Sequence, residues 1–149
     1  MKAPIIARAL GIAFFAAGVL GFVPYVTVPH GIADPWVTLD ANYVFIAGIF
    51  PVNVVHDGLH MLFGIWGIGA STSFKASVRF CRVVAWVYFI LVVLGAIPIF
   101  NTLFGIAPIY GWDVLLHFVI ALLALYGGYG AGRLQDESEP EPIIAPPPL

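Results

Sequence analysis

Two short stretches of this sequence place polar side chains with metal-binding or proton-transfer chemistry inside otherwise apolar segments. Together they form a polar cluster, which consists of Asn53, His56, Asp57, His60, Asp113 and His117. His56 and His60 stand four residues apart, as do Asp113 and His117, so on a helix each pair lies on one face. Three imidazoles and a carboxylate suit Zn²⁺ or another first-row transition-metal ion. His56, His60, Asp113 and His117 are therefore candidate metal ligands.

Three other interpretations of the same residues stay open. The first, which we favour, is an interhelical hydrogen-bond clamp, because polar networks more often stabilise than catalyse. In it Asp113 orients His117 one turn away, and Asp57 or Asn53 bonds His60. Such bonds contribute about 0.6–2 kcal/mol each in membranes. The second is a haem held between His60 and His117. The third is passage of protons or ions along the polar faces.

The sequence contains no signature of a catalytic site. Nothing in it resembles a nucleophile triad, a phosphate-binding loop or a C-x-x-C pair. Cys81 is the single cysteine, so an intramolecular disulfide is excluded. The net charge of −2 and the lack of a basic patch argue against nucleic acid as a partner. We expect a protein without catalytic residues, and most simply without a cofactor, with a metal ion or haem as the alternatives.

The composition predicts an integral membrane protein. Of 149 residues, 61% are hydrophobic and 9% are charged, whereas soluble domains carry about a quarter charged residues. We predict an all-α fold in a single transmembrane domain over residues 1–134. Its four spans, each near the roughly 20 apolar residues that cross a bilayer, cover about residues 5–27, 51–71, 80–100 and 112–133.

The basic residues predict the orientation of these spans. They are Lys2, Arg8, Lys75, Arg79, Arg82 and Arg133. With four spans all six lie on one side, so the positive-inside rule places both termini and a polar turn at residues 71–82 in the cytoplasm. The expected location is the bacterial inner membrane. The acidic, proline-rich residues 135–149 form a disordered cytoplasmic tail in this prediction, with Ile143 and Ile144 as possible anchors for a partner.

The longest connection between predicted spans, residues 28–50, faces outward. Pro29, Pro35 and two aspartates interrupt any span there. We expect a short amphipathic piece at about residues 43–49 to lie in the membrane interface. Trp36 and Tyr43 would be its aromatic anchors.

The sequence also repeats itself. Val-Leu-Gly-x-x-Pro occurs at residues 19–24 and 93–98, and Gly-Ile-x-Pro occurs at 48–51 and 105–108, in each case nine residues before a histidine. This pattern predicts two helical hairpins that are parallel repeats. Small residues follow the polar ones along the second and fourth helices and predict close helix packing between these two faces. They are Gly64, Gly67, Ala121, Ala124 and Gly128.

The stretches 50–64 and 102–117 are similar to the central motifs of a known family. The chain resembles, over about residues 5–130, the bacterial four-helix membrane family catalogued as domain of unknown function four-three-eight-three. Family members usually carry Asn where this chain has Asp57. The resemblance implies the four-helix fold and leaves the function open. We expect a structural or accessory role in the bilayer, with the chain associating with itself or with a larger membrane complex. A metal- or haem-binding redox protein is the alternative, and a small transporter or proton pathway is the third possibility.

Overall fold

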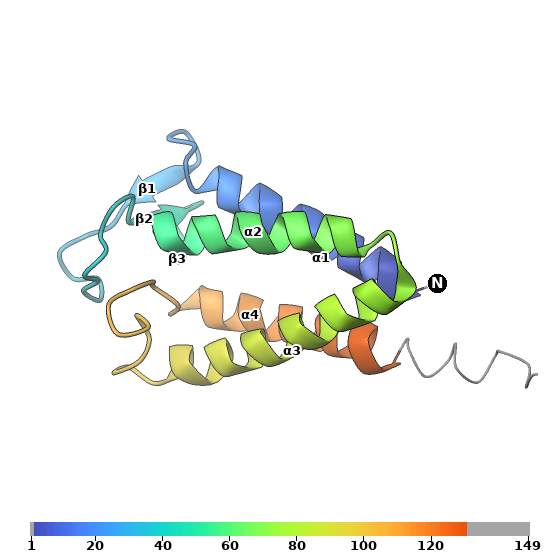
Figure 1. Cartoon of the computed structure of the whole chain (residues 1–149). Coiled ribbons are helices and arrows are strands. Elements are labelled where there is room, and N and C mark those ends of the chain that lie inside the picture. Colours follow the sequence, from blue (N-terminus) through green and yellow to red (C-terminus); the bar gives the residue numbers. More distant parts are fainter. Residues whose placement is uncertain (1, 131–149) are drawn as a thin grey trace, which may run out of the picture.

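Four long helices form two pairs that lie roughly lengthwise against each other (Figure 1). The structure is a computed structural model and describes residues 2–130; the predicted tail at 135–149 lies outside this range. The helices are α1 (Lys2–Leu20), α2 (Val54–Ala70), α3 (Phe74–Ala96) and α4 (Trp112–Leu125), the last continuing as a π-helix, η1 (Tyr126–Gly130).

Three of the helical segments are long and apolar enough to cross a membrane. These are Lys2–Leu20, Phe74–Ala96 and the continuous α4–η1 segment Trp112–Gly130. Helix α2 is shorter, with 17 residues. The described residues therefore form a mostly helical protein of membrane character.

The prediction of a polar turn over residues 71–82 is wrong. Helix α3 begins at Phe74, so the connection from α2 is only residues 71–73. Lys75, Arg79 and Arg82 consequently lie on the first turns of α3. Lysine and arginine are good helix formers, and their long stems let the charged groups reach water from a helix end.

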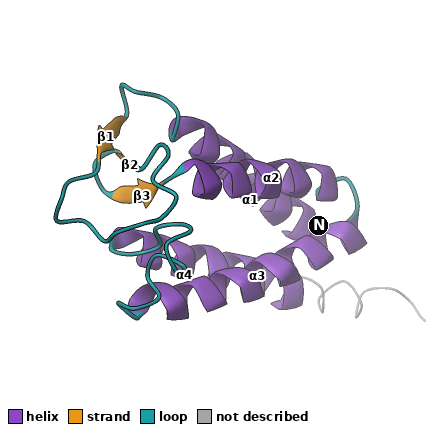
Figure 2. Cartoon of the chain, turned by 60° about the vertical axis from the view of Figure 1, so that its left-hand side comes forward, coloured by secondary structure: helices purple, strands orange, loops and turns teal. Residues whose placement is uncertain are grey.

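A small antiparallel sheet stands where we expected an amphipathic interfacial piece. It consists of β1 (Thr27–Pro29), β2 (Val44–Ile46) and β3 (Phe50–Val52), with β2 in the middle (Figure 2). Ala47 and Gly48 adopt left-handed backbone conformations (φ 52° and 73°) that turn the chain from β2 into β3. Tyr43 is 4% exposed and is therefore not an interfacial anchor.

Gly64 and Gly67 of α2 pack against α1 and not against α4. A Cβ placed on Gly64 would lie 2.6 Å from the backbone nitrogen of Phe15, and one on Gly67 would lie 2.8 Å from the Cα of Gly11. On η1, a Cβ on Gly128 would lie 2.9 Å from the backbone nitrogen of Arg82 in α3. The predicted contact between the small-residue faces of the second and fourth helices is therefore wrong. Helical periodicity identifies a packing face, but it does not identify the partner of that face.

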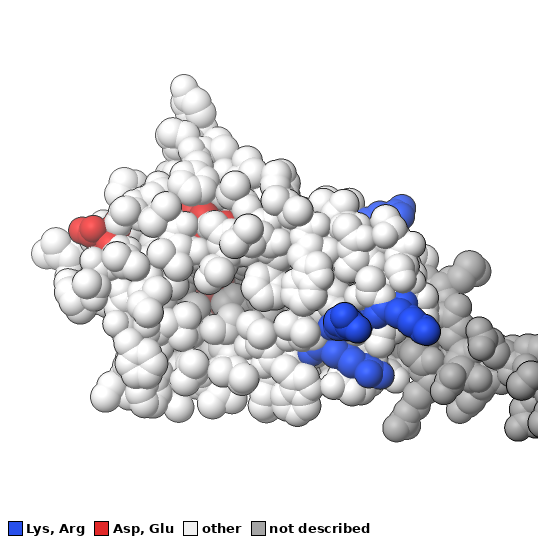
Figure 3. All heavy atoms as spheres, in the orientation of Figure 1, with Lys and Arg blue, Asp and Glu red and all other residues white. Residues whose placement is uncertain are grey.

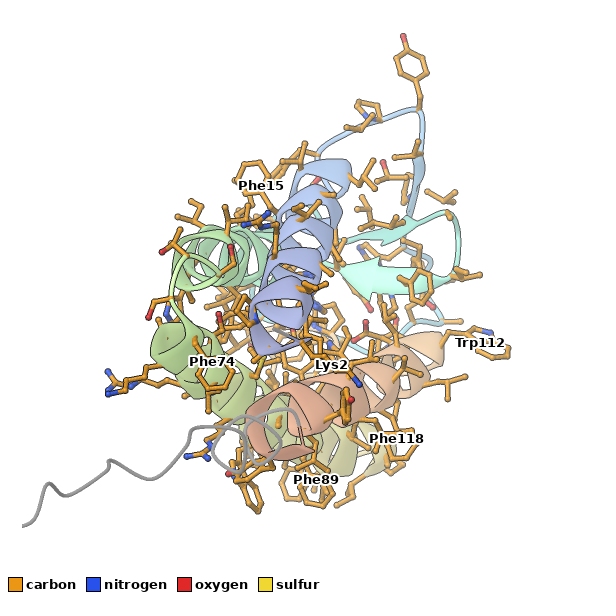
Figure 4. All side chains as sticks on the ribbon, turned by 90° about the vertical axis from the view of Figure 1, so that its right-hand side faces the viewer. Lys2, Phe15, Phe74, Phe89, Trp112 and Phe118 are labelled. Atoms are coloured by element: carbon orange, nitrogen blue, oxygen red, sulfur yellow. The ribbon has the colours of Figure 1, made fainter. Side chains whose placement is uncertain are left out.

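The apolar core lies where the two helix pairs meet. Its buried residues come from all four helices and are Ala7, Leu10, Phe14, Ala70, Phe80, Cys81, Val84, Ala85, Tyr88, Ala121 and Ala124. Other large apolar side chains point outward, such as Phe15, Phe89 and Phe118 (Figure 4). A bundle that is apolar both inside and outside suits a lipid surrounding.

Candidate metal centre

Asn53 fixes the position of the candidate centre, because it joins the start of α2 to both outer connections. It is the N-cap residue of α2, and its Oδ1 accepts a 3.0 Å hydrogen bond from the backbone N–H of His56. Its Nδ2 donates to the carbonyl oxygens of Leu39 and Ile106, each at 2.8 Å. The side chain is fully buried. Three hydrogen bonds from one amide therefore hold the first turn of α2 against residues 39 and 106.

Three histidines converge just below this anchor. His56 and His60 lie one turn apart on α2, with ring centroids 4.6 Å apart. The His117 ring of α4 lies 5.9 Å from that of His56. One ring nitrogen from each histidine lies within 4.8 Å of the other two. All three side chains are buried, at 5%, 8% and 1% exposure for His56, His60 and His117. The structure thus gathers three imidazole rings, whose nitrogen lone pairs could bind a metal ion, at the boundary between the helix pairs.

The hydrogen bonds of these rings leave metal-binding lone pairs available. His56 Nδ1 lies 3.0 Å from the carbonyl oxygen of Pro108. Since a carbonyl can only accept, Nδ1 carries the proton, and Nε2 keeps its lone pair. His60 Nδ1 and both ring nitrogens of His117 have no hydrogen-bond partner among residues 2–130. Buried polar atoms are normally paired, so these nitrogens are candidates for binding a ligand.

Asp113 lies beside His117 and outside the group of three ring nitrogens. Its Oδ2 is 3.4 Å from His117 Nδ1, one turn along α4. This contact falls short of a hydrogen bond, since neither atom has a hydrogen-bond partner in the described part of the chain. If His117 held a metal ion, a carboxylate in this place would orient the imidazole and would not itself be a ligand. The structure therefore separates Asp113 from the other predicted ligands.

Asp57 faces away from the three histidines, toward the end of α1. Its Oδ2 accepts a 3.2 Å hydrogen bond from Asn42 Nδ2, and its Oδ1 has no partner among the described residues. A Cβ on Gly21 would overlap this carboxylate, so glycine is required there. The expectation that Asp57 or Asn53 bonds His60 is wrong. Neighbouring residues on a helix point about 100° apart, so Asp57 and His56 face different neighbours of α2.

Aromatic rings fill the space around the imidazoles. Phe14 stacks on His60 with centroids 5.6 Å apart, and the Tyr88 ring meets His117 edge-on at 4.8 Å. A porphyrin between His60 and His117 would have to displace these rings. A hollow of about 550 Å³ does occur on α4, but it is lined by Trp112, Phe118 and their neighbours and by no histidine. The geometry therefore favours a single ion over a haem.

Two tyrosines connect the outer loops above the site. The hydroxyls of Tyr43 and Tyr110 form a hydrogen bond with each other, and Tyr43 also donates to the carbonyl of Pro35 at 3.1 Å. Burial raises the pKa of the Tyr43 phenol and that of the Tyr110 phenol above the ordinary value. Both rings are therefore neutral at physiological pH and add hydrogen bonds without charge.

Sequence reasoning missed several residues that build the site. The carbonyl of Pro108 orients His56, Asn42 bonds Asp57, and Tyr43 bonds Tyr110. Asn42 has a left-handed backbone (φ 56°), a conformation in which Asn is enriched, so its turn position was readable in principle. A backbone carbonyl has no residue signature, so the role of Pro108 was not.

Comparison with known proteins adds a family and no activity. The family model described as Domain of unknown function (DUF4383) matches residues 5–130. No curated protein and no solved structure matches the chain. The matched range contains the whole candidate centre, so its chemistry has to be inferred from its geometry.

Proposed function

The chain belongs to the family described as Domain of unknown function (DUF4383), and we propose that it is a membrane protein that binds one first-row transition-metal ion. The ligands are His56, His60 and His117. The observation that carries this proposal is the convergence of three buried imidazoles whose nitrogens lie within 4.8 Å of one another. Burying one ring nitrogen of His60 and both of His117 without partners costs free energy that a metal ion would recover.

The distances are compatible with coordination after a small adjustment. An ion with metal–nitrogen bonds of about 2.0–2.1 Å holds tetrahedral ligands about 3.3 Å apart. The nitrogens lie within 4.8 Å, so a rotation of the imidazoles closes the remaining separation. His56 is already fixed by Pro108, and the less constrained rings of His60 and His117 make the adjustment.

Three protein ligands leave one tetrahedral position for a small exchangeable ligand such as water. Structural zinc sites usually have four protein ligands, whereas open sites have three. Asp113 lies next to His117 and would raise the basicity of that ring. The centre is therefore of the open type, with Asp113 as its supporting carboxylate.

Metal binding by the purified protein tests this proposal. We expect one equivalent of Zn²⁺ per chain, and Co²⁺ substitution giving the visible absorption of a tetrahedral site. His60→Ala and His117→Ala should each weaken Zn²⁺ binding by at least about tenfold. His30→Ala is the matched control, because His30 lies in an exposed outer segment. Wild-type protein without a bound equivalent, or His117→Ala protein that binds as tightly as wild type, would refute the site.

We propose further that α2 also crosses the bilayer, which gives four spans and cytoplasmic termini. Its 17 residues extend about 25 Å at 1.5 Å per residue, close to the roughly 30 Å hydrocarbon core. The described cations gather at the end of the bundle that carries the N-terminus (Figure 3), while Asp34 and Asp40 belong to the long connection after α1. A cysteine at Thr72 should be shielded from an impermeant maleimide in intact cells, and one at Ile32 should react. The opposite labelling pattern would show that the termini lie on the outer side of the membrane.

The structural or accessory role favoured by the sequence stays a prediction. It is compatible with the metal site, because an ion bound by both α2 and α4 would also join the two helix pairs. Self-association in mild detergent, measured by light scattering, is the direct test of that role.

A further inference from the structure

One exposed face of α3 changes from basic to aromatic to aliphatic along the helix. Lys75, Arg79 and Arg82 follow one another at spacings of four and three residues, so they lie on the same face. All three side chains are exposed. The same face continues with Trp86, Ile90 and Val93, which are 57%, 53% and 46% exposed. This order matches the headgroup, interface and acyl-chain regions of a phospholipid.

The basic part of this face has no acidic partner within the described residues. Between residues 2 and 130 the structure contains no ion pair of a lysine or arginine with a carboxylate. Lys2 and Arg8 of α1 are exposed as well, and Figure 3 shows the cations together at this end of the bundle. The charge is thus available to an anion from outside the described structure.

Arg82 and Trp86 are held in place by η1. Arg82 Nε donates a 2.9 Å hydrogen bond to the carbonyl of Gly128, and its guanidinium lies 4.8 Å from the ring centroid of Tyr129. Trp86 Nε1 donates to the Tyr129 hydroxyl at 2.9 Å. The π-helix therefore orders an arginine and a tryptophan side by side. A fixed guanidinium loses little further freedom when it binds a phosphate.

We propose that this face of α3 binds an anionic phospholipid. The headgroup phosphate lies against Lys75, Arg79 and Arg82, and Trp86 sits at the depth of the glycerol backbone, where tryptophan is enriched in membrane proteins. An acyl chain runs past Ile90 to Val93. From Arg82 to Val93 the helix rises about 16 Å, which matches one leaflet, about half of the roughly 30 Å hydrocarbon core. This inference does not depend on the metal site.

The test compares two lipids with identical acyl chains on the detergent-solubilised full chain. Phosphatidylglycerol should bind in native mass spectra and raise the Tm, and phosphatidylcholine should not. The double variant Lys75→Gln/Arg79→Gln should bind phosphatidylglycerol about thirtyfold more weakly, as expected from about 1 kcal/mol for each basic residue near the surface. Lys2→Gln is the matched control and should bind like wild type, because Lys2 lies on α1, outside this face of α3, and its Nζ is already hydrogen-bonded to the Tyr126 hydroxyl at 3.0 Å.

Three results would overturn the proposal. Equal stabilisation by phosphatidylcholine would show that the acyl chains alone are recognised. The same Tm shift with inorganic phosphate would show a site for a free anion, not for a lipid. Unchanged binding in the double variant would remove α3 from the site. Arg79→Lys, which keeps the charge, should bind phosphatidylglycerol and thereby separates the loss of charge from a folding defect.

Discussion

His56 Nδ1 and the carbonyl oxygen of Pro108 are 3.0 Å apart, and this hydrogen bond, together with that from Asn53 to Ile106, joins the start of α2 to the connection that precedes α4. The bond sets the tautomer of His56: Nδ1 carries the proton, and Nε2 keeps a lone pair that can bind a metal ion. It also brings the two polar segments of the sequence together. The geometry of the candidate centre thus depends on a backbone carbonyl as much as on the imidazoles.

Replacing His56 should separate the structural from the metal-binding role of its ring. His56→Ala leaves the Pro108 carbonyl without its partner, which costs about 1–3 kcal/mol of unfolding free energy. The loss should be present in metal-free buffer, and thermal unfolding with a chelator measures it. Ile32→Ala should leave the metal-free Tm unchanged, since the Ile32 side chain is fully exposed. If His56→Ala lowers the Tm only when Zn²⁺ is present, the bond to Pro108 contributes no stability.

Asp113→Asn should weaken metal binding without abolishing it. An amide keeps the shape of the carboxyl group, whose Oδ2 lies 3.4 Å from His117 Nδ1, but it cannot ionise. Loss of such a supporting group typically reduces metal affinity by about 10–100-fold. Competition with a chromophoric chelator gives the Kd for Zn²⁺. Complete loss of binding, equal to that of His117→Ala, would instead make Asp113 a direct ligand.

Asn53 variants should reveal which of its hydrogen bonds matter most. Asn53→Asp keeps the oxygen that accepts from His56 N–H but loses both donations to Leu39 and Ile106. Two buried carbonyls are then unpaired, at a cost of about 1–3 kcal/mol each. Asn53→Ala should be at least as destabilising. Denaturation of the solubilised protein measures both, with the fully exposed Ile32→Ala as control. An Asn53→Asp protein as stable as wild type would show that the loops are held by other contacts.

Substitution by alanine should lower the stability at one glycine of α2 and raise it at another. A methyl group at Gly64 would lie 2.6 Å from the backbone of Phe15 and would push α1 away, at a cost of about 1–3 kcal/mol. Gly69 has no neighbouring atom within 4 Å of the added carbon, so Gly69→Ala should raise stability by up to about 1 kcal/mol through helix propensity. The difference in Tm between the two variants is the measurement. Equal effects would mean that α1 and α2 do not pack this closely.

Stability should fall above about pH 10, because Tyr43 and Tyr110 bind their protons more tightly in the folded protein. Burial raises both pKa values, whereas an unfolded tyrosine titrates near about 10. The contribution is complete below that pH and is lost as the pH rises further, since the unfolded chain then releases protons first. Tyr43→Phe should flatten the pH dependence of the unfolding free energy. Tyr25→Phe, with a ring that is 98% exposed, should not change it.

The sequence was sufficient for the parts of the fold that depend on helical periodicity. Long apolar segments predicted the helices, and the spacing of His56 and His60 placed both rings on one face of α2. The family resemblance over residues 5–130 is confirmed by the family model. These features depend on local composition and on one repeating angle, and both can be read from a single chain.

Features that depend on pairing between distant residues were not readable. Strands of three residues, such as Val44–Ile46, are too short to show an alternating pattern, and their pairing fixes them. The partner of Gly64 is α1, although its polar neighbours suggested α4. Asp57 and His56 are adjacent in sequence, yet the first bonds Asn42 and the second bonds Pro108.

The short connection at residues 71–73 has a consequence for how the protein assembles. It is the only covalent link between the α1–α2 pair and the α3–α4 pair, and it lies at the end of the bundle opposite the sheet (Figure 1). Each pair has its own closely packed seam. The gene cut at this point should therefore yield two fragments that enter the membrane separately and reassociate. A metal ion bound by His60 and His117 would link the two halves. Removal of the metal by a chelator should therefore lower the stability of the reassembled protein more than that of the intact chain.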